Sequence, residues 1–290
     1  MTSVIDAIDQ ALADALRRSR GSDCPALLGQ AMHHAVFPSG KRLRPRLVLA
    51  VAQACGSGDP DLVLASATAI ELLHCASLVH DDLPCFDAAS TRRGQPSVHA
   101  AFGERLAVLA GDALIVLAFE TLSHGSVRSP VRGLRVLAAV AQAVGAPRGI
   151  AAGQAWECEA EVDLEAYHGA KTGALFAGAA AAGALAAGVE PRAWHDFGQL
   201  LGRAFQVADD LCDALDDAET LGKPVGRDAD LGRPSMVGAC GVEGAFGSAR
   251  ALIDQALQAI PDCPGRDAFH DLLVRETSRL LPARKARVAA

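Results

Sequence analysis

The stretch LVLASATAIELLHCASLVHDDLPCFD, residues 62–87, decides the fold class because a long apolar segment ends abruptly in acids. Alanine and leucine, which are strong helix formers, dominate residues 62–79. Pro84 stops the helix, since proline cannot continue it. Asp81 and Asp82 stand at this end, and Asp87 follows shortly after. The pattern therefore predicts a helix that carries several carboxylates at its C-terminal end.

The same helical spacing recurs outward along the chain, whereas alternation typical of strands is rare. Glycine and proline clusters separate the segments. Helices are expected over residues 5–16, 47–54, 62–79, 106–122, 131–144, 150–161, 172–188, 193–215, 245–260 and 268–281. No polar linker divides the chain, and no short tandem repeat occurs. The sequence predicts an all-α fold: one domain over residues 1–290, built as a bundle of about ten or more helices.

Composition and charge exclude several classes of protein. Half of the residues are apolar and only 21% are charged, which excludes a disordered chain. The net charge is −7 and aromatic residues make up only 4%, whereas nucleic-acid-binding proteins are usually basic and offer aromatic stacking platforms. We therefore expect no nucleic-acid partner.

Cysteine usage and hydropathy predict the compartment. The eight cysteines are scattered and form no C-x-x-C pair, which favours free thiols in a reducing cytoplasm. The first twenty residues contain acids and no apolar core of a signal peptide. The uncharged stretch 173–189 is short and rich in alanine and glycine, which favours a tightly packed buried helix over a membrane span. We expect a cytoplasmic protein without a transmembrane segment.

A second acidic cluster, QVADDLCD, occupies residues 206–213. Asp209 and Asp213 share a helix face, where like charges repel, and Asp81 and Asp82 end a helix, where the dipole disfavours negative charge. Divalent cations would offset both penalties, and Mg²⁺ is typically held by one or two carboxylates plus phosphate oxygens. One such cluster alone could be a solvated helix end. Two clusters in one all-α chain favour a metal site.

Basic residues cluster near the acidic ones. Segment 41–46 carries four cations. Further basic residues that follow the motifs are Arg92, Arg93, Lys171, Lys223 and Arg233. Arginine presents a rigid fork for phosphate, and lysine presents a point charge. Each of these groups alone is typical of a solvated face. Together with two clusters of metal-binding type, they indicate a site for two phosphorylated groups.

The motifs in question are Gly40-Lys41-Arg42-Leu43-Arg44-Pro45, Asp81-Asp82-x4-Asp87, Arg92-Arg93-Gly94, Gly111-Asp112, Gly153-Gln154, Lys171-Thr172-Gly173, Phe205-Gln206-x2-Asp209-Asp210-x2-Asp213 and Leu221-Gly222-Lys223-Pro224. In order and spacing this set resembles the trans-polyprenyl diphosphate synthases. The local sequence is most similar to that of bacterial geranylgeranyl diphosphate synthases of carotenoid and bacteriochlorophyll pathways. The segments that carry this similarity are His74–His80, Cys85–Asp87, Trp156-Glu157 and Ala166–His168.

The resemblance implies an isoprenoid-synthase bundle around a central cavity, in which isopentenyl diphosphate elongates an allylic diphosphate (dimethylallyl, geranyl or farnesyl). It implies a homodimer. It assigns three Mg²⁺ ions, for which Mn²⁺ can substitute, to Asp81, Asp82, Asp87, Asp209 and Asp213, and adds Asp210 to the catalytic set. It assigns the allylic diphosphate and its cation to Arg92, Lys171, Thr172, Gln206 and Lys223. It assigns the binding of isopentenyl diphosphate to Gly40, Lys41, Arg44, His74 and Arg93.

Several positions depart from the pattern of the family, among them Ala88 and Ala89, which replace acids often seen just after the first cluster. Ser39 stands where a second glycine is usual, and Glu157 stands where an aspartate is common. Arg233 stands near a usual lysine and weakens the expectation of a substrate contact there. The expected metal ligands remain, so the resemblance implies an active enzyme.

Product length is expected to depend on Leu73, Ala76 and Ser77. Ala76 and Ser77 lie just over one helical turn before Asp81 and are small enough for a prenyl tail to pass. Leu72 and Leu73 lie a turn further down and could form a floor. A helical turn rises by about 5.4 Å, roughly one isoprene unit, so we expect a C20 product.

Three alternatives stay open from the sequence. The first is a farnesyl diphosphate (C15) synthase. The second is a related enzyme that cyclises or condenses head-to-head, against which the complete segment 40–44 argues. The third is a non-catalytic partner subunit of another prenyl synthase, against which the two intact acidic clusters argue.

Overall fold

The computed structural model describes residues 3–21, 23–37, 40–215 and 235–281, and this part of the chain is almost entirely helical. The described residues contain one small sheet, a hairpin of two short strands, β1 (Thr91–Arg92) and β2 (Gln95–Pro96). The α-helices are α1 (Val4–Ser19), α2 (Ala26–Val36), α3 (Leu43–Ala54), α4 (Pro60–Asp81), α5 (Val98–Phe102), α6 (Glu104–Gly125), α7 (Pro130–Val144), α8 (Ile150–Ala155), α9 (Leu164–His168), α10 (Ala174–Ala186), α11 (Arg192–Leu215), α14 (Met236–Gln258) and α15 (Arg266–Thr277).

The all-α prediction is confirmed, although several helix ends differ from expectation. Helix α3 begins at Leu43 and includes Pro45, because proline is tolerated in the first turn, where no intrahelical N–H is required. Helix α14 begins at Met236, well before residue 245, and bends at Gly241, whose φ is 71°. The segment expected to be one helix over 150–161 instead passes from α8 into a 3₁₀ turn at Trp156–Cys158. Helices α2, α5 and α9 were not predicted.

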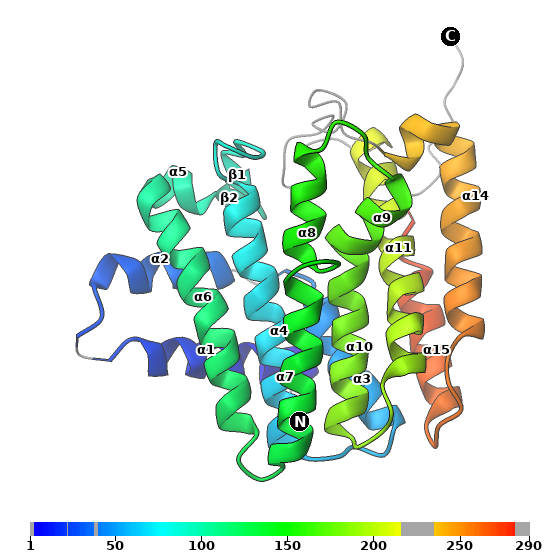
Figure 1. Cartoon of the computed structure of the whole chain (residues 1–290), viewed down its shortest axis with the longest axis horizontal. Helices are drawn as coiled ribbons and strands as arrows, with labels where there is room; N and C mark the ends of the chain where they lie inside the picture. Colours follow the sequence, from blue (N-terminus) through cyan, green and yellow to red (C-terminus); the bar gives the residue numbers. More distant parts are fainter. Residues whose placement is uncertain (1–2, 22, 38–39, 216–234, 282–290) are drawn as a thin grey trace.

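The long helices stand side by side, while α1 and α2 lie across one flank of the bundle (Figure 1). Helix α10 is buried along its whole length and packs against α3, α7 and α11. Glycines permit this close packing: a Cβ on Gly183 would lie 2.5 Å from the Val48 carbonyl oxygen, and one on Gly198 would lie 2.6 Å from the Ala177 Cα. The expected tightly packed alanine–glycine helix is therefore present.

Two helices, α4 and α6, have the length and hydropathy of membrane spans, a test that core helices also pass. The apolar window of α4 is 78% buried inside the protein, which identifies it as a core helix. That of α6 is only 44% buried, so α6 leaves an apolar face uncovered. Helix α4 ends at Asp81, and the last turns of α11 carry the second acidic cluster, so both clusters come to the same end of the bundle.

Candidate active site

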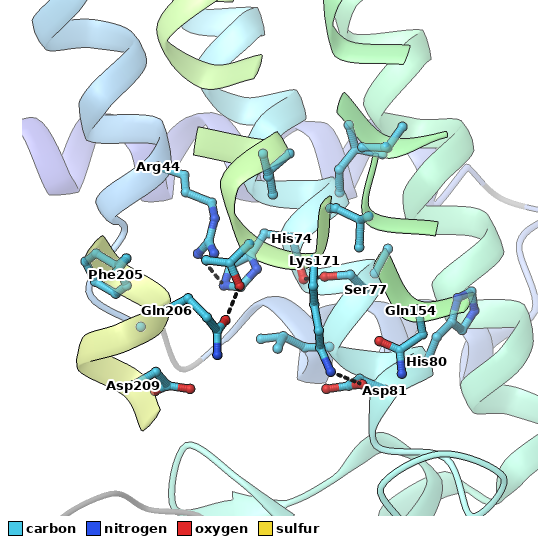
Figure 2. A pocket seen from close by; sticks show the side chains of 18 of the residues that line it. Arg44, His74, Ser77, His80, Asp81, Gln154, Lys171, Phe205, Gln206 and Asp209 are labelled. Carbon is cyan, nitrogen blue, oxygen red and sulfur yellow. Dashed lines mark hydrogen bonds and ion pairs between the residues drawn. The ribbon is translucent and has the colours of Figure 1, made fainter. Parts of the chain in front are cut away.

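One cavity of about 990 Å³ opens at that end of the bundle. Figure 2 shows Asp81 and Asp209 approaching its opening from two different helices. Five aspartates line the cavity, and we call four of them the aspartate mouth: Asp81, Asp87, Asp209 and Asp213. The fifth is Asp210, whose side chain is almost completely buried. The loop after α4 folds back so that the Asp87 backbone N–H donates to the Asp81 carbonyl at 2.9 Å, which explains how a residue six positions later returns to the same place.

Asp82 occupies a different environment from Asp81. Its side chain is only 3% exposed and accepts hydrogen bonds from Nε of Arg92 at 3.0 and 3.2 Å, with a further ion pair to Nη2. Burial raises the pKa of the Asp82 carboxyl, against the lowering effect of Arg92. Asp82 is not among the residues that line the cavity, and its expected role as a metal ligand stays a prediction. In this structure it holds Arg92, which does line the cavity.

Lys171 lies on a π-helical turn, Gly169–Gly173, that interrupts the approach to α10. Its Nζ pairs with the Glu157 carboxylate and lies 3.9 Å from Asp81 Oδ1. Glu157 also accepts a hydrogen bond from the Tyr167 hydroxyl at 2.7 Å. Glu157, noted above only as a departure from the family pattern, therefore helps to place Lys171 at the mouth.

Thr172, the next residue, donates its hydroxyl hydrogen to Oε1 of Gln206, and this contact is drawn in Figure 2. Both side chains line the cavity just inside the aspartate mouth. Gln206 Nε2 donates to Asp210 at 2.8 Å, so these three expected residues form one chain of hydrogen bonds.

A second group of polar side chains lines the cavity beside the mouth, and we call it the arginine pocket: Arg44, His74 and Arg93. Buried Nε of Arg44 and Nη1 of Arg93 have no hydrogen-bond partner within the described part of the chain. Burial lowers the pKa of Arg44 to about 10, which still leaves it charged near neutral pH. Two charged side chains with hydrogen-bond donors in one cavity lining favour a bound anion.

His74 is neutral in this pocket. Arginine can only donate, so Nε2 of His74 accepts from Nη1 of Arg44 across 3.3 Å. Burial, followed by the charges of Arg44 and Arg93, holds the pKa of His74 well below its usual value. The ring therefore orients Arg44 without adding charge.

Gly40 and Lys41 lie at the rim of the pocket. A Cβ on Gly40 would come within 2.8 Å of the Arg93 guanidinium, so a larger residue here would displace that side chain. Arg42, although part of the same basic segment, is fully buried and pairs with Glu71 at 2.7 Å and Asp9 at 2.9 Å. Its role is to tie α1, α3 and α4 together.

The inner part of the cavity is apolar. Leu73, Ala76 and Ser77 of α4 line it as expected, whereas Leu72 belongs to the hydrophobic core and is absent from the lining. Facing helices add a wall that the sequence did not reveal, formed by Ile115, Val144 and Ile150.

The Gly111-Asp112 motif acquires a structural explanation. A Cβ on Gly111 would lie 2.1 Å from Nε2 of His80, so this glycine makes room for the imidazole between α4 and α6. The exposed Asp112 carboxylate lies 3.7 Å from the same nitrogen.

Sequence reasoning missed Glu71 and Tyr167, which line the cavity, and His168, whose Nε2 lies 3.9 Å from Oδ2 of Asp210. Glu71 stands out in retrospect, because an acid inside the apolar run of α4 requires a buried partner. Lys223 and Arg233 lie outside the described residues, so their expected contacts have no structural counterpart here.

Comparison with known proteins places the chain in a family. The polyprenyl synthetase family model matches residues 25–267. A geranylgeranyl diphosphate synthase of Cereibacter sphaeroides is 50% identical over 279 residues, which are 96% of this chain and 97% of that protein. A geranylgeranyl diphosphate synthase of Rhodobacter capsulatus is 50% identical over 258 residues, with 89% of each chain covered.

A solved structure shows the same fold. The crystal structure of a geranyltransferase from Helicobacter pylori, complexed with magnesium and isoprenyl diphosphate, has a TM-score of 0.79 and 30% sequence identity to this chain. The match covers 96% of this chain and 99% of the other. The chain therefore belongs to the polyprenyl synthetase family and is a trans-prenyltransferase.

Proposed function

We propose that the protein joins isopentenyl diphosphate head-to-tail to allylic diphosphates and releases geranylgeranyl diphosphate. The observation that carries this proposal is the division of one cavity into three parts. The aspartate mouth and the arginine pocket suit two diphosphates, and the apolar interior suits a prenyl tail. A protein that bound a single diphosphate would need only one of the two polar parts.

Divalent cations fit the aspartate mouth. Within the described ranges, no group of three His, Cys, Asp or Glu side chains could hold an ion by itself. Mg²⁺ needs only one or two carboxylates when substrate phosphates complete its shell. Asp81, Asp87, Asp209 and Asp213 would therefore hold three Mg²⁺ ions, or Mn²⁺ in their place, together with the diphosphate of the substrate. When bound, the ions supply positive charge that stabilises the departing diphosphate.

The protein's own groups then divide the work. Lys171 and Arg92 draw charge toward the allylic diphosphate as its C–O bond breaks. The oxygens of Thr172 and Gln206 face the allylic cation that this leaves. The apolar walls exclude water, which would otherwise capture the cation.

Arg44 and Arg93 hold isopentenyl diphosphate beside this cation, so its terminal alkene carbon forms the new carbon–carbon bond to C1 of the allylic group. The neighbouring carbon becomes cationic and loses a proton from C2 to the released diphosphate. A new allylic diphosphate results, one isoprene unit longer. No side chain needs to act as a nucleophile.

Chain length follows from the cavity's inner wall. Ala76 and Ser77 are small and line the cavity, so a tail can run past them along α4. Leu73, Ile115, Val144 and Ile150 narrow the space further in. These residues support termination at C20 rather than at C15.

An exposed apolar face supports a homodimer. Large aliphatic side chains on α6, α7 and the turn between them are 41–78% exposed: Val108, Leu109, Val116, Val127, Val131 and Leu134. A patch of this kind is typical of a protein interface, and a two-fold contact would bury it in both copies at once. Sedimentation of the wild-type protein and of Leu109→Lys tests this contact; an unchanged mass for the variant contradicts it.

We place the enzyme in the cytoplasm, with carotenoid or bacteriochlorophyll synthesis as the pathway suggested by the local resemblance.

Incubation with labelled isopentenyl diphosphate and each of three primers (dimethylallyl, geranyl and farnesyl diphosphate) tests the proposal. A C20 main product from all three supports it. A C15 main product favours the farnesyl diphosphate synthase, and no incorporation without a second protein favours the partner subunit.

A further inference from the structure

The second acidic cluster contains one carboxylate that is almost completely buried. The Asp210 side chain is 2% exposed, whereas Asp209 beside it is exposed at the mouth. The two oxygens of Asp210 serve different elements. Oδ1 accepts from Gln206 Nε2 at 2.8 Å, and Oδ2 accepts from the backbone N–H of Met236, the first residue of α14, at 2.7 Å. Asp210 therefore connects the cavity wall to the start of a neighbouring helix.

The direction of each hydrogen bond in this group is fixed. A backbone N–H can only donate, and an ionised carboxylate can only accept. Gln206 must therefore present its amide nitrogen to Asp210 and turn its carbonyl oxygen away from it. That oxygen, Oε1, accepts from the Thr172 hydroxyl, and both of these side chains line the cavity.

We infer that Asp210 is a positioning residue that decides which end of the Gln206 amide faces the reacting cation. The inference rests on the proposed function, which places Gln206 beside that cation. A carbonyl oxygen directed at a developing positive charge stabilises it, whereas an amide NH₂ in the same place repels it. Asp210 thus acts on the allylic cation through the orientation of Gln206.

The substitution Asp210→Asn probes the direction of the amide. Asparagine has one acceptor oxygen, and the fixed Met236 N–H takes it. The Asn amide nitrogen then faces Gln206, whose own amide must rotate to accept from it. This rotation turns the Gln206 NH₂ toward Thr172 and the cavity, which reverses the dipole at the cation.

A second substitution repairs the reversed pattern. In the double variant Asp210→Asn with Gln206→Glu, the Asn amide nitrogen donates to one oxygen of the glutamate. The other glutamate oxygen faces Thr172 and the cavity as an acceptor, and Met236 keeps its partner. The formal charge of the pair is the same as in the wild type, because the carboxylate has only changed place.

Single-turnover condensation of geranyl diphosphate with isopentenyl diphosphate provides the readout, together with both KM values and the thermal unfolding temperature. We expect Q206A and D210N each to slow condensation by about 100-fold, with both KM values within about twofold of wild type. The double variant recovers at least about tenfold over D210N. The control is Ser235→Ala, which removes the α14 N-cap bond to Gly238 (3.1 Å): it lowers the unfolding temperature and leaves the rate unchanged.

Several outcomes overturn the inference. D210N at the wild-type rate, beside an impaired Q206A, overturns the positioning role alone. A wild-type rate for Q206A overturns the role of Gln206 itself, and absence of any condensation by the wild type overturns the proposed function. If D210N does not fold, the double variant is compared with Q206E, in which two carboxylates oppose each other. A double variant no faster than Q206E contradicts the relay.

Discussion

The aspartate mouth and the arginine pocket of one cavity are suited to the same chemical group by opposite means. The mouth offers carboxylates, which repel a diphosphate unless cations stand between them. The arginine pocket offers Arg44 and Arg93, charged donors that line the cavity. Under the proposed function, metal ions at the mouth would draw charge from one diphosphate and promote its departure, whereas the arginines would hold the other in place. One cavity would thus treat its two diphosphates differently.

The mouth also shows that adjacent aspartates need not share a role. Asp81 and Asp209 are the more exposed members of the two doublets, whereas Asp82 and Asp210 are buried and hold neighbouring groups. Asp82 fixes the cation of Arg92, and Asp210 fixes a neutral amide. Each doublet therefore combines one outward carboxylate with one that supports the wall behind it.

The largest effect is expected at the mouth. Asp81→Ala or Asp209→Ala should lower turnover on the order of 10³-fold or more, because the charge that the metal ions bring to the leaving group is lost with its ligand. Turnover and circular dichroism of each variant measure activity and fold. The matched control is Asp112→Ala, which removes an exposed carboxylate outside the cavity lining and should leave turnover unchanged. Full activity of the wild type in excess chelator would contradict the comparison.

A smaller and selective effect is expected in the arginine pocket. Arg44→Ala should raise the KM for isopentenyl diphosphate by about 10- to 100-fold, the value of a charged hydrogen bond, and leave that for the allylic primer within about threefold. Lys41→Ala should act in the same direction but less, since Lys41 is exposed at the rim. Steady-state kinetics with each substrate varied in turn separate the two constants.

Arg46→Ala is the control for that experiment. Arg46 lies on the same helix, pairs with Glu276 at 2.7 Å and does not line the cavity, so neither KM should change. An Arg44→Ala variant with equal increases in both KM values would show that the pocket does not distinguish the two diphosphates.

The smallest effect concerns the neutral ring in the arginine pocket. The pKa of folded His74 lies well below 6.5, so the unfolded chain binds a proton first as the pH falls, and stability is lost below about pH 6.5. Between about pH 7.5 and 5.5, the wild-type free energy of unfolding should fall by roughly 1 kcal/mol more than that of His74→Gln. Urea unfolding of the ligand-free proteins at both pH values measures the difference. Identical pH dependences would mean that His74 is not held neutral.

The sequence was informative where a few adjacent residues carry the signal. The acidic doublets and the basic segment could be found from the sequence, because each places like charges close together and the resulting repulsion depends only on neighbouring residues. The inward orientation of Asp82 and Asp210 could not be predicted. Their partners Arg92 and Met236 come close to them only when the chain folds. Arg42 shows the converse, since its position among phosphate-binding cations gave no sign of its buried pair with Glu71.

The residues of the cavity wall also differ in whether the sequence could predict them. Leu73, Ala76 and Ser77 could be predicted from their distance to Asp81 along one helix, whereas Ile115 and Val144 depend on how α6 and α7 pack against α4. Helix ends were least predictable where the backbone departs from regularity, as in the π turn that presents Lys171.

The central claim is that one cavity ionises an allylic diphosphate at its mouth and limits the growing chain along α4. Product length in Ala76→Tyr and Ser77→Phe, measured by chromatography beside the wild type, tests it most directly. Both positions line the cavity just over one turn from Asp81, so a bulky ring there shortens the space by about one isoprene unit. We expect a C20 main product for the wild type and a C15 main product for the variants, with elongation retained. A wild type that makes chiefly C15, or an Ala76→Tyr variant that still makes C20, would contradict it.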